Sequence, residues 1–147
     1  MSRIFQVMGL MVAFVMYGNA AEVVSINAVP SGKATNVVTA IKTDKAETIY
    51  HVWIYSGKRS GEVFIYDAAT KTGKAADQAD LNWLKERKIE GARMIVKLPV
   101  EPSPAFHTRS QKTIDTKELS LWRVEVYDST NLKPIGQTAL GEGIPAN

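Results

Sequence analysis

Two short segments of the sequence carry the side chains best suited to chemistry. Residues 51–57 read His-Val-Trp-Ile-Tyr-Ser-Gly and residues 106–112 read Phe-His-Thr-Arg-Ser-Gln-Lys, and together they contain both histidines of the chain. Imidazole can act as a general base or a metal ligand, aromatic rings can stack on a sugar or an apolar partner, and guanidinium binds carboxylates through two hydrogen bonds. The candidate binding residues are His51, Trp53, Tyr55, Phe106, His107, Arg109, Ser110 and Lys112.

These residue types do not form a recognisable catalytic or metal-binding motif. Two histidines can supply only half of a tetrahedral zinc site, and the sequence has no cysteine, no His-x-His pair and no cluster of carboxylates beside either histidine. None of Ser56, Ser103 and Ser110 stands in a Gly-x-Ser-x-Gly turn, so no nucleophilic serine is indicated. We therefore predict no catalytic residue, no metal ligand and no cofactor.

The first 20 residues are typical of a secretory signal peptide. Arg3 provides the positive start, residues 4–17 form a mostly apolar run, and Gly18-Asn19-Ala20 supplies small residues for cleavage after Ala20. The apolar run is shorter than the roughly 20 residues that cross a bilayer. An uncleaved N-terminal anchor is the alternative, and we expect no stable membrane span after cleavage.

Composition narrows the class of partner and the compartment. Arg3 is the only charged residue of the first 20, so residues 21–147 keep 17 basic and 15 acidic side chains. That balance is too mild for a nucleic-acid-binding domain, which usually has a strongly basic patch. Without cysteine, an exported chain has no disulfide and must fold on its core alone. We expect a single domain over residues 21–147, periplasmic or secreted from a bacterium.

Alternating apolar side chains predict an all-β fold. In residues 48–55, the side chains at even positions share one face of a strand and those at odd positions share the other. Both faces are apolar or aromatic, which indicates a central strand covered on both sides. About seven strands joined by short polar turns favour an antiparallel, immunoglobulin-like β-sandwich, with a β-barrel as the alternative.

One stretch interrupts the β pattern. Residues 67–93 are expected to form an insert of loop and helix, with a flexible loop at 68–74 and the helix near 77–88. Leu81 and Leu84 should face the sheet, and Trp83 should pack beside them. Residues 62–66 are expected to return as the hairpin partner of 48–55. The strands are expected at residues 22–28, 36–42, 48–55, 62–66, 92–100, 105–113, 119–127 and 134–140.

The two aromatic segments also carry a family resemblance. The pattern His51-x-Trp53, the segment with Thr108, Ser110 and Lys112, and the strand Trp122-Arg123-Val124-Glu125-Val126 followed by Asp128 resemble the DUF2914 family, a bacterial domain of unknown function. The similarity covers residues 48–57 and 106–136. Phe106 stands where the family tends to have Trp, His107 stands where it tends to have Arg, and the 67–93 insert lengthens the link. The resemblance implies a small β-sandwich and no settled activity.

These observations favour an exported, non-catalytic β-sandwich binding module of the bacterial envelope, with a protein or a glycan as its partner. The polar residues His51, His107, Arg109, Ser110 and Lys112 are expected to share an exposed rim. Alternating aromatic rings are also typical of a sandwich core, where His51 would be a hydrogen-bonded core or rim residue. A periplasmic hydrolase or lyase that uses His51 or His107, and a structural subunit of an envelope assembly, are the alternatives.

Overall fold

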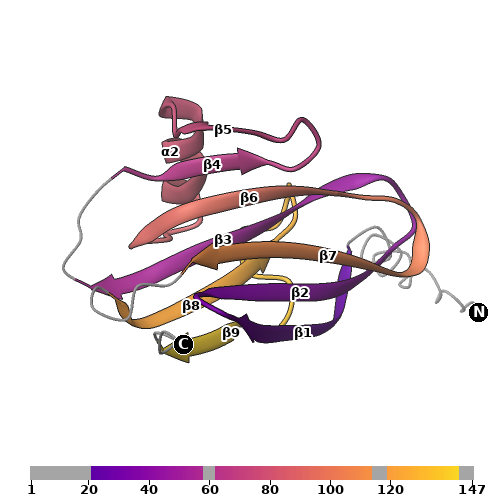
Figure 1. Ribbon diagram of the computed structural model, residues 1–147. Helices are drawn as coiled ribbons and strands as arrows, with labels where there is room; N and C mark the ends of the chain where they lie inside the picture. Colours follow the sequence, from indigo (N-terminus) through magenta and orange to yellow (C-terminus); the bar gives the residue numbers. More distant parts are fainter. Residues whose placement is uncertain (1–20, 58–61, 114–118, 143–147) are drawn as a thin grey trace, which may run out of the picture.

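The computed structural model describes residues 21–57, 62–113 and 119–142, which form two β-sheets and one helix (Figure 1). The smaller sheet has the order β1-β2-β7, and the larger has the order β5-β4-β6-β3-β8-β9. Most neighbouring strands are antiparallel, and the sheets stay separate, so the predicted sandwich is confirmed. The elements are β1 (Glu22–Ser31), β2 (Ala34–Thr43), β3 (Glu47–Gly57), β4 (Phe64–Asp67), β5 (Thr72–Ala75), α2 (Gln78–Glu86), β6 (Ala92–Val100), β7 (Ser103–Thr113), β8 (Leu119–Tyr127) and β9 (Ala139–Glu142).

Strand β3 is the central strand of the larger sheet, as its two apolar faces predict. It pairs antiparallel with β6 on one side and β8 on the other. Ile49, His51 and Trp53 point toward the smaller sheet and are fully buried. Val52 and Ile54 point the other way and are buried against the helix side. Because β3 is buried on both faces, it provides a fixed position for the side chains that it directs toward the smaller sheet.

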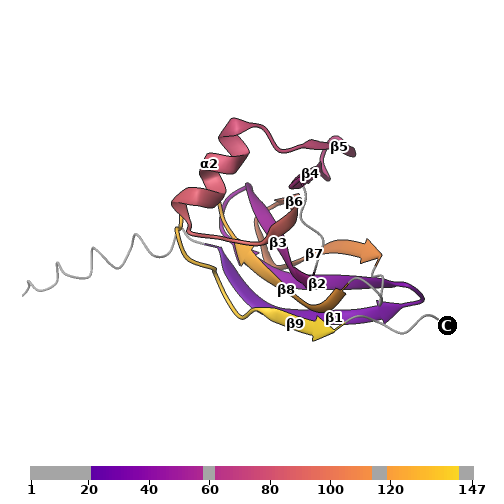
Figure 2. The same cartoon turned by 90° about the vertical axis from the view of Figure 1, so that its left-hand side faces the viewer.

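Helix α2 covers the outer face of the larger sheet, on the side away from β7 (Figure 2). Asp77 caps its N-terminus: the Asp77 carboxylate accepts from the Asp80 backbone N–H at 2.9 Å, and the Asp80 carboxylate accepts from the Asp77 N–H at 3.0 Å. The Asp80 amide and the Lys74 ammonium lower the pKa of Asp77 to about 2. Leu84 packs against the sheet as expected, whereas Leu81 is exposed because it faces away from it.

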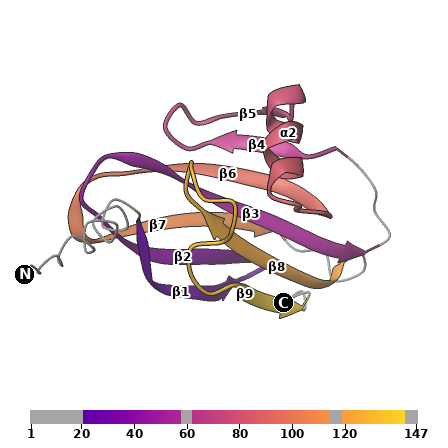
Figure 3. The ribbon, with the colours of Figure 1, turned by 180° about the vertical axis from the view of Figure 1, so that it is seen from behind.

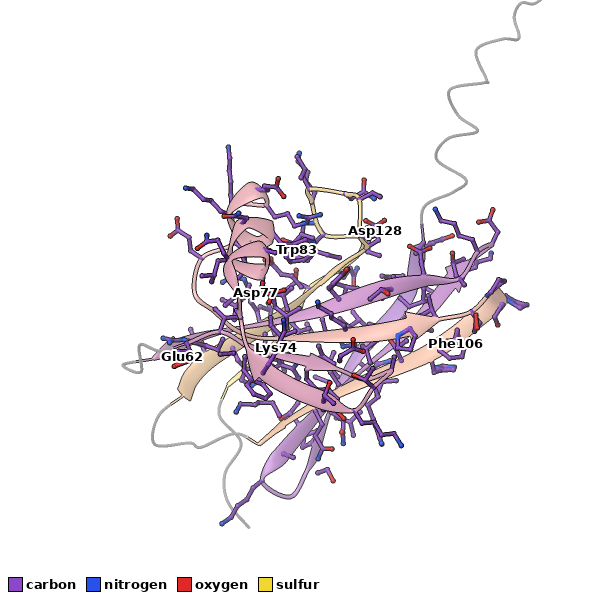
Figure 4. All side chains as sticks on the ribbon, turned by 90° about the horizontal axis from the view of Figure 1, so that it is seen from above. Glu62, Lys74, Asp77, Trp83, Phe106 and Asp128 are labelled. Atoms are coloured by element: carbon purple, nitrogen blue, oxygen red, sulfur yellow. The ribbon has the colours of Figure 1, made fainter. Side chains whose placement is uncertain are left out.

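An aromatic cluster fixes the helix to the sheet. The Trp83 ring lies 4.8 Å from the Tyr50 ring and 5.6 Å from the Tyr127 ring, and the Arg87 guanidinium lies 4.0 Å from the Trp83 ring centroid. Figure 4 shows Trp83 between the helix and the loop that contains Asp128. Arg87 also donates to the Trp83 and Ser129 carbonyls. The prediction that Trp83 is a packing residue is confirmed.

Besides the orientation of Leu81, three local predictions are wrong. Residues 64–67 do not pair with β3: strand β6 lies between them, and β4 runs parallel to β6. Residues 72–75, expected within a loop, form β5 and pair with β4, because the Asp67 carboxylate accepts the Ala69 N–H and supports a tight turn. Residues 134–138 form irregular backbone, and β9 starts only at Ala139. The first 20 residues lie outside the described part of the chain.

The smaller sheet is too narrow to cover the larger one completely. At one edge β1 lies beside β9, and the two sheets close against each other (Figures 2 and 3). At the opposite edge β7 faces β6, while β4 and β5 extend beyond it (Figure 1). Among the described strands, none covers the inner face of β4. No helix in the described ranges has the length and apolar character to cross a membrane.

Candidate functional site

A chain of hydrogen bonds between buried polar side chains joins the two sheets. His51 of β3 contacts Ser110 of β7 through Nδ1 at 2.7 Å and Thr39 of β2 through Nε2 at 3.0 Å. Thr39 is in turn hydrogen-bonded to Thr108, which lies directly opposite on β7. Trp53 donates its indole N–H to Ser110 Oγ at 3.1 Å. We call these five residues the polar core.

Strand geometry explains why these residues meet. Thr108 and Ser110 are two positions apart on β7, as are His51 and Trp53 on β3, so each pair shares one face of its strand. Both pairs point into the space between the sheets. Burial of an unpaired polar group costs free energy, and each member of the polar core has a partner that reduces this cost. The polar core therefore specifies how β2 and β7 align over β3.

The hydrogen-bond polarity depends on the tautomer of His51. An indole nitrogen can only donate, so Ser110 Oγ always accepts from Trp53. When Nδ1 is unprotonated, Ser110 donates to His51, and Nε2–H donates to Thr39. In the other tautomer Nδ1–H donates to Ser110, which leaves the serine proton for another acceptor. The imidazole is neutral in both cases, because burial lowers the pKa of His51 to about 3.

The contact between Ser110 and His51 has the geometry of a nucleophile and its base, but its surroundings differ from those of a catalytic triad. His51 Nε2 faces the Thr39 hydroxyl, where a triad has a carboxylate that stabilises the imidazolium. His51 has no exposed surface, and Ser110 is only 3% exposed. A pKa near 3 also makes His51 a weak base at neutral pH. The polar core is suited to holding the sheets together.

A cleft of about 480 Å³ lies beside the polar core, where β4 and β5 extend past β7. Its floor is apolar: Phe64 and Tyr66 of β4 and Met94 and Val96 of β6 line it. In each strand the two lining residues are two positions apart, so they project from the same face of the sheet. Phe64 is 45% exposed, an unusual position for a large ring. The volume lies within the roughly 300–1,000 Å³ of small-ligand sites.

The opposite wall and the rim of the cleft are polar and basic. Arg109, Ser110 and Gln111 of β7 form the wall, and Lys71 lies at the rim in the turn between β4 and β5. None of the lining residues is acidic. Within the described residues, neither Lys71 nor Arg109 forms an ion pair. The cleft thus combines an apolar floor with two cations that are available to a ligand.

Of the predicted site residues, three belong to the polar core, Arg109 and Ser110 line the cleft, and the rest lie elsewhere. His51, Trp53 and Ser110 are buried in the polar core, so the expectation of one exposed rim that includes His51 and Ser110 is wrong. The reason is that Thr108 and Ser110 occupy positions of β7 that face the other sheet, whereas His107, Arg109 and Gln111 occupy the alternate, exposed positions. Arg109 and His107 are exposed, Phe106 packs at the edge of the core, and Lys112 is half-buried. The side chain of Tyr55 lies outside the described residues.

His107 does not join the polar core. It alternates with Thr108 along β7 and is therefore on the outer face of the smaller sheet, away from His51. Phe106 lies toward the end of the sandwich opposite Glu62 (Figure 4). The two imidazoles do not converge in one cleft, which removes the arrangement that a two-histidine site needs. In the described ranges no three His, Asp or Glu side chains are grouped as metal ligands.

Sequence reasoning missed Lys71, Phe64 and Tyr66 as members of the site. The alternation of Phe64 and Tyr66 was visible, but their place beside β7 depends on the parallel pairing of β4 with β6. No family model matches the chain, and no curated protein matches it. The resemblance to the DUF2914 family therefore stays a prediction.

Proposed function

We propose that the chain is an exported, non-catalytic binding module of the bacterial envelope, and that its protein or glycan partner binds in the cleft. The observation that carries the proposal is the combination of an apolar floor, on which the Phe64 ring is 45% exposed, with two cations, Lys71 and Arg109, that form no ion pair with any described residue. An exposed aromatic ring such as Phe64 gives a ligand apolar area or a stacking surface. The two cations favour a partner with carboxylate or phosphate groups.

The cleft can be tested by charge removal. Lys71→Gln with Arg109→Gln should reduce the retention of an envelope partner on the immobilised chain at least about 10-fold, because two charge-assisted contacts are lost. The matched control is Lys33→Gln with Lys42→Gln, which removes the same charge from exposed positions outside the cleft. A partner held equally by all three proteins would contradict the proposal. In the same preparation, mass spectrometry of the exported chain should give an N-terminus at Ala21.

The contact between Ser110 and His51 favours a hydrolase as the second candidate. Its test is labelling of the chain with a fluorophosphonate, which reacts with nucleophilic serines. A non-catalytic module should remain unlabelled. Labelling that is lost in Ser110→Ala would establish the hydrolase instead.

A further inference from the structure

We propose that the cleft takes an extended acidic peptide, which adds to β7 as a further β-strand. This inference rests on the proposed function and names the class of its partner. Its starting point is which residues of each strand line the cleft. On β4 and β6 they are alternate residues, as expected where a cleft meets the face of a sheet. On β7 they are three consecutive residues, Arg109, Ser110 and Gln111.

Consecutive residues of a strand point to opposite faces. Ser110 is buried between the sheets, whereas Arg109 and Gln111 are exposed on the other side. All three can line one cleft only if the cleft meets β7 along its edge, where the backbone is accessible. The wall of the cleft is therefore backbone edge, while its floor is a side-chain face.

No described strand pairs with the edge of β7 on this side. Among the described residues, β2 is the only strand that pairs with β7. A strand with one partner has N–H and C=O groups on its other edge that can pair with an added strand. Pro104 stands near the beginning of β7 and blunts only that end, and no proline follows it up to Thr113.

The apolar floor of the cleft and its two cations determine which kind of peptide would fit as the added strand. A strand beside β7 would turn every second side chain toward the apolar floor that Phe64 and Met94 help to form. Lys71 and Arg109 lie at the same cleft and form no ion pair with the residues that the structure describes, so carboxylates on the intervening positions are complementary. An extended peptide that alternates acidic and apolar residues meets both requirements.

The other edges of the sheets fit this role less well. The outer edge of β1 lies beside β9, where the two sheets close. Strands β5 and β9 each have four residues, too few to guide a long partner. Strand β7 has 11 residues, and three of them line a cleft that also has an apolar floor and two cations.

The probe for this proposal is an acetylated ten-residue peptide that alternates Glu with Val or Phe, measured by calorimetry against residues 21–147. Replacement of Lys71 and Arg109 by Gln should weaken its binding at least about 10-fold, and the Lys33→Gln, Lys42→Gln control should bind normally. Backbone amides of residues 109–111 should exchange more slowly in the complex.

N-methylation of the peptide distinguishes backbone pairing from side-chain binding. N–H groups of alternate residues point to the same side of a strand, so methylation of one alternate set should abolish binding, while the other set is tolerated. Equal binding of both methylated peptides would overturn strand addition and leave the cleft as a binding site. Binding of oligogalacturonate, an acidic glycan, without binding of the peptide would also overturn it and support the broader proposal. Binding of neither probe would count against both.

Discussion

The polar core and the cleft are neighbours that share Ser110, but their polar groups are in opposite environments. In the polar core the side chains of five residues are buried and hydrogen-bonded to one another. In the cleft, Lys71 and Arg109 have no anionic partner within the described residues, and the Phe64 ring is partly exposed. Satisfied polar groups indicate a structural role, whereas unpaired charges beside exposed apolar surface indicate a binding role.

The difference shows how one strand can serve both roles. The inward residues of β7, Thr108 and Ser110, complete the polar core. Its edge and the exposed Arg109 face the cleft. Function and stability should therefore be separable by mutation at adjacent positions of the same strand.

The largest expected effect is on stability. His51→Ala should lower the free energy of unfolding by about 3–5 kcal/mol, because it leaves a cavity and removes hydrogen bonds from buried hydroxyl groups. Arg109→Gln should change it by less than about 0.5 kcal/mol, since this side chain is exposed and forms no ion pair with a described residue. Urea denaturation measures both. If both variants lost the same free energy of unfolding, the polar core and the cleft would not have separate roles.

The polar core should also make stability depend on pH. The pKa of His51 is about 3 in the folded chain and 6.5 when the residue is solvated, so the unfolded chain binds a proton first as the pH falls. The contribution of the buried, neutral His51 to the free energy of unfolding is therefore complete above about pH 6.5 and decreases as the pH falls toward 3. The free energy of unfolding should fall by at most about 1.4 kcal/mol per pH unit in this range.

Denaturant titrations between pH 7 and 4 measure this slope. His51→Gln removes the titrating group and keeps a side chain that can form hydrogen bonds, so its pH dependence should be shallower than that of the natural chain. The cleft variant Arg109→Gln should keep the natural slope. A slope that is the same in His51→Gln would show that the carboxylates, and not the buried imidazole, cause the loss of stability.

Much of the fold follows from local pattern. The alternation in residues 48–55 and 119–127 predicts strands because side chains of a strand alternate with a period of two, and aromatic residues on both faces of 48–55 predict a central strand. The helix near 77–88 is predicted by its cap, Asp77, and by the spacing of its apolar residues. These features depend on neighbours in the sequence, so the sequence alone is enough to find them.

The site depends on contacts that are distant in the sequence. Thr108 and Ser110 are polar residues on the buried face of β7. The usual rule that polar side chains face water would wrongly predict that they are exposed. Their burial follows only from the partners that β2 and β3 provide. The cleft likewise requires β4 to pair with β6 across an intervening strand and helix. Strand pairing over such separations leaves no local signal.

A pair of glycines offers the finest comparison between the two regions. A Cβ on Gly141 would lie 2.2 Å from the ring of Trp122, and a Cβ on Gly73 would lie 2.3 Å from the ring of Phe64. The two added Cβ atoms would clash with the rings to nearly the same extent, but the two rings differ in how easily they can move away. Trp122 is buried and packs 5.5 Å from the ring of Trp53, whereas Phe64 is 45% exposed at the cleft.

Gly141→Ala should therefore cost about 1–3 kcal/mol, the usual range for overpacking of a filled core. Gly73→Ala should cost less than about 1 kcal/mol, because Phe64 can rotate toward solvent, but it should change the cleft and weaken binding of the acidic peptide. Thermal unfolding and calorimetry measure the two quantities. If Gly73→Ala destabilised the chain as much as Gly141→Ala, Phe64 would belong to the packed structure. The Phe64 ring would then be held in place by packing and would not adapt to a ligand, although it is partly exposed.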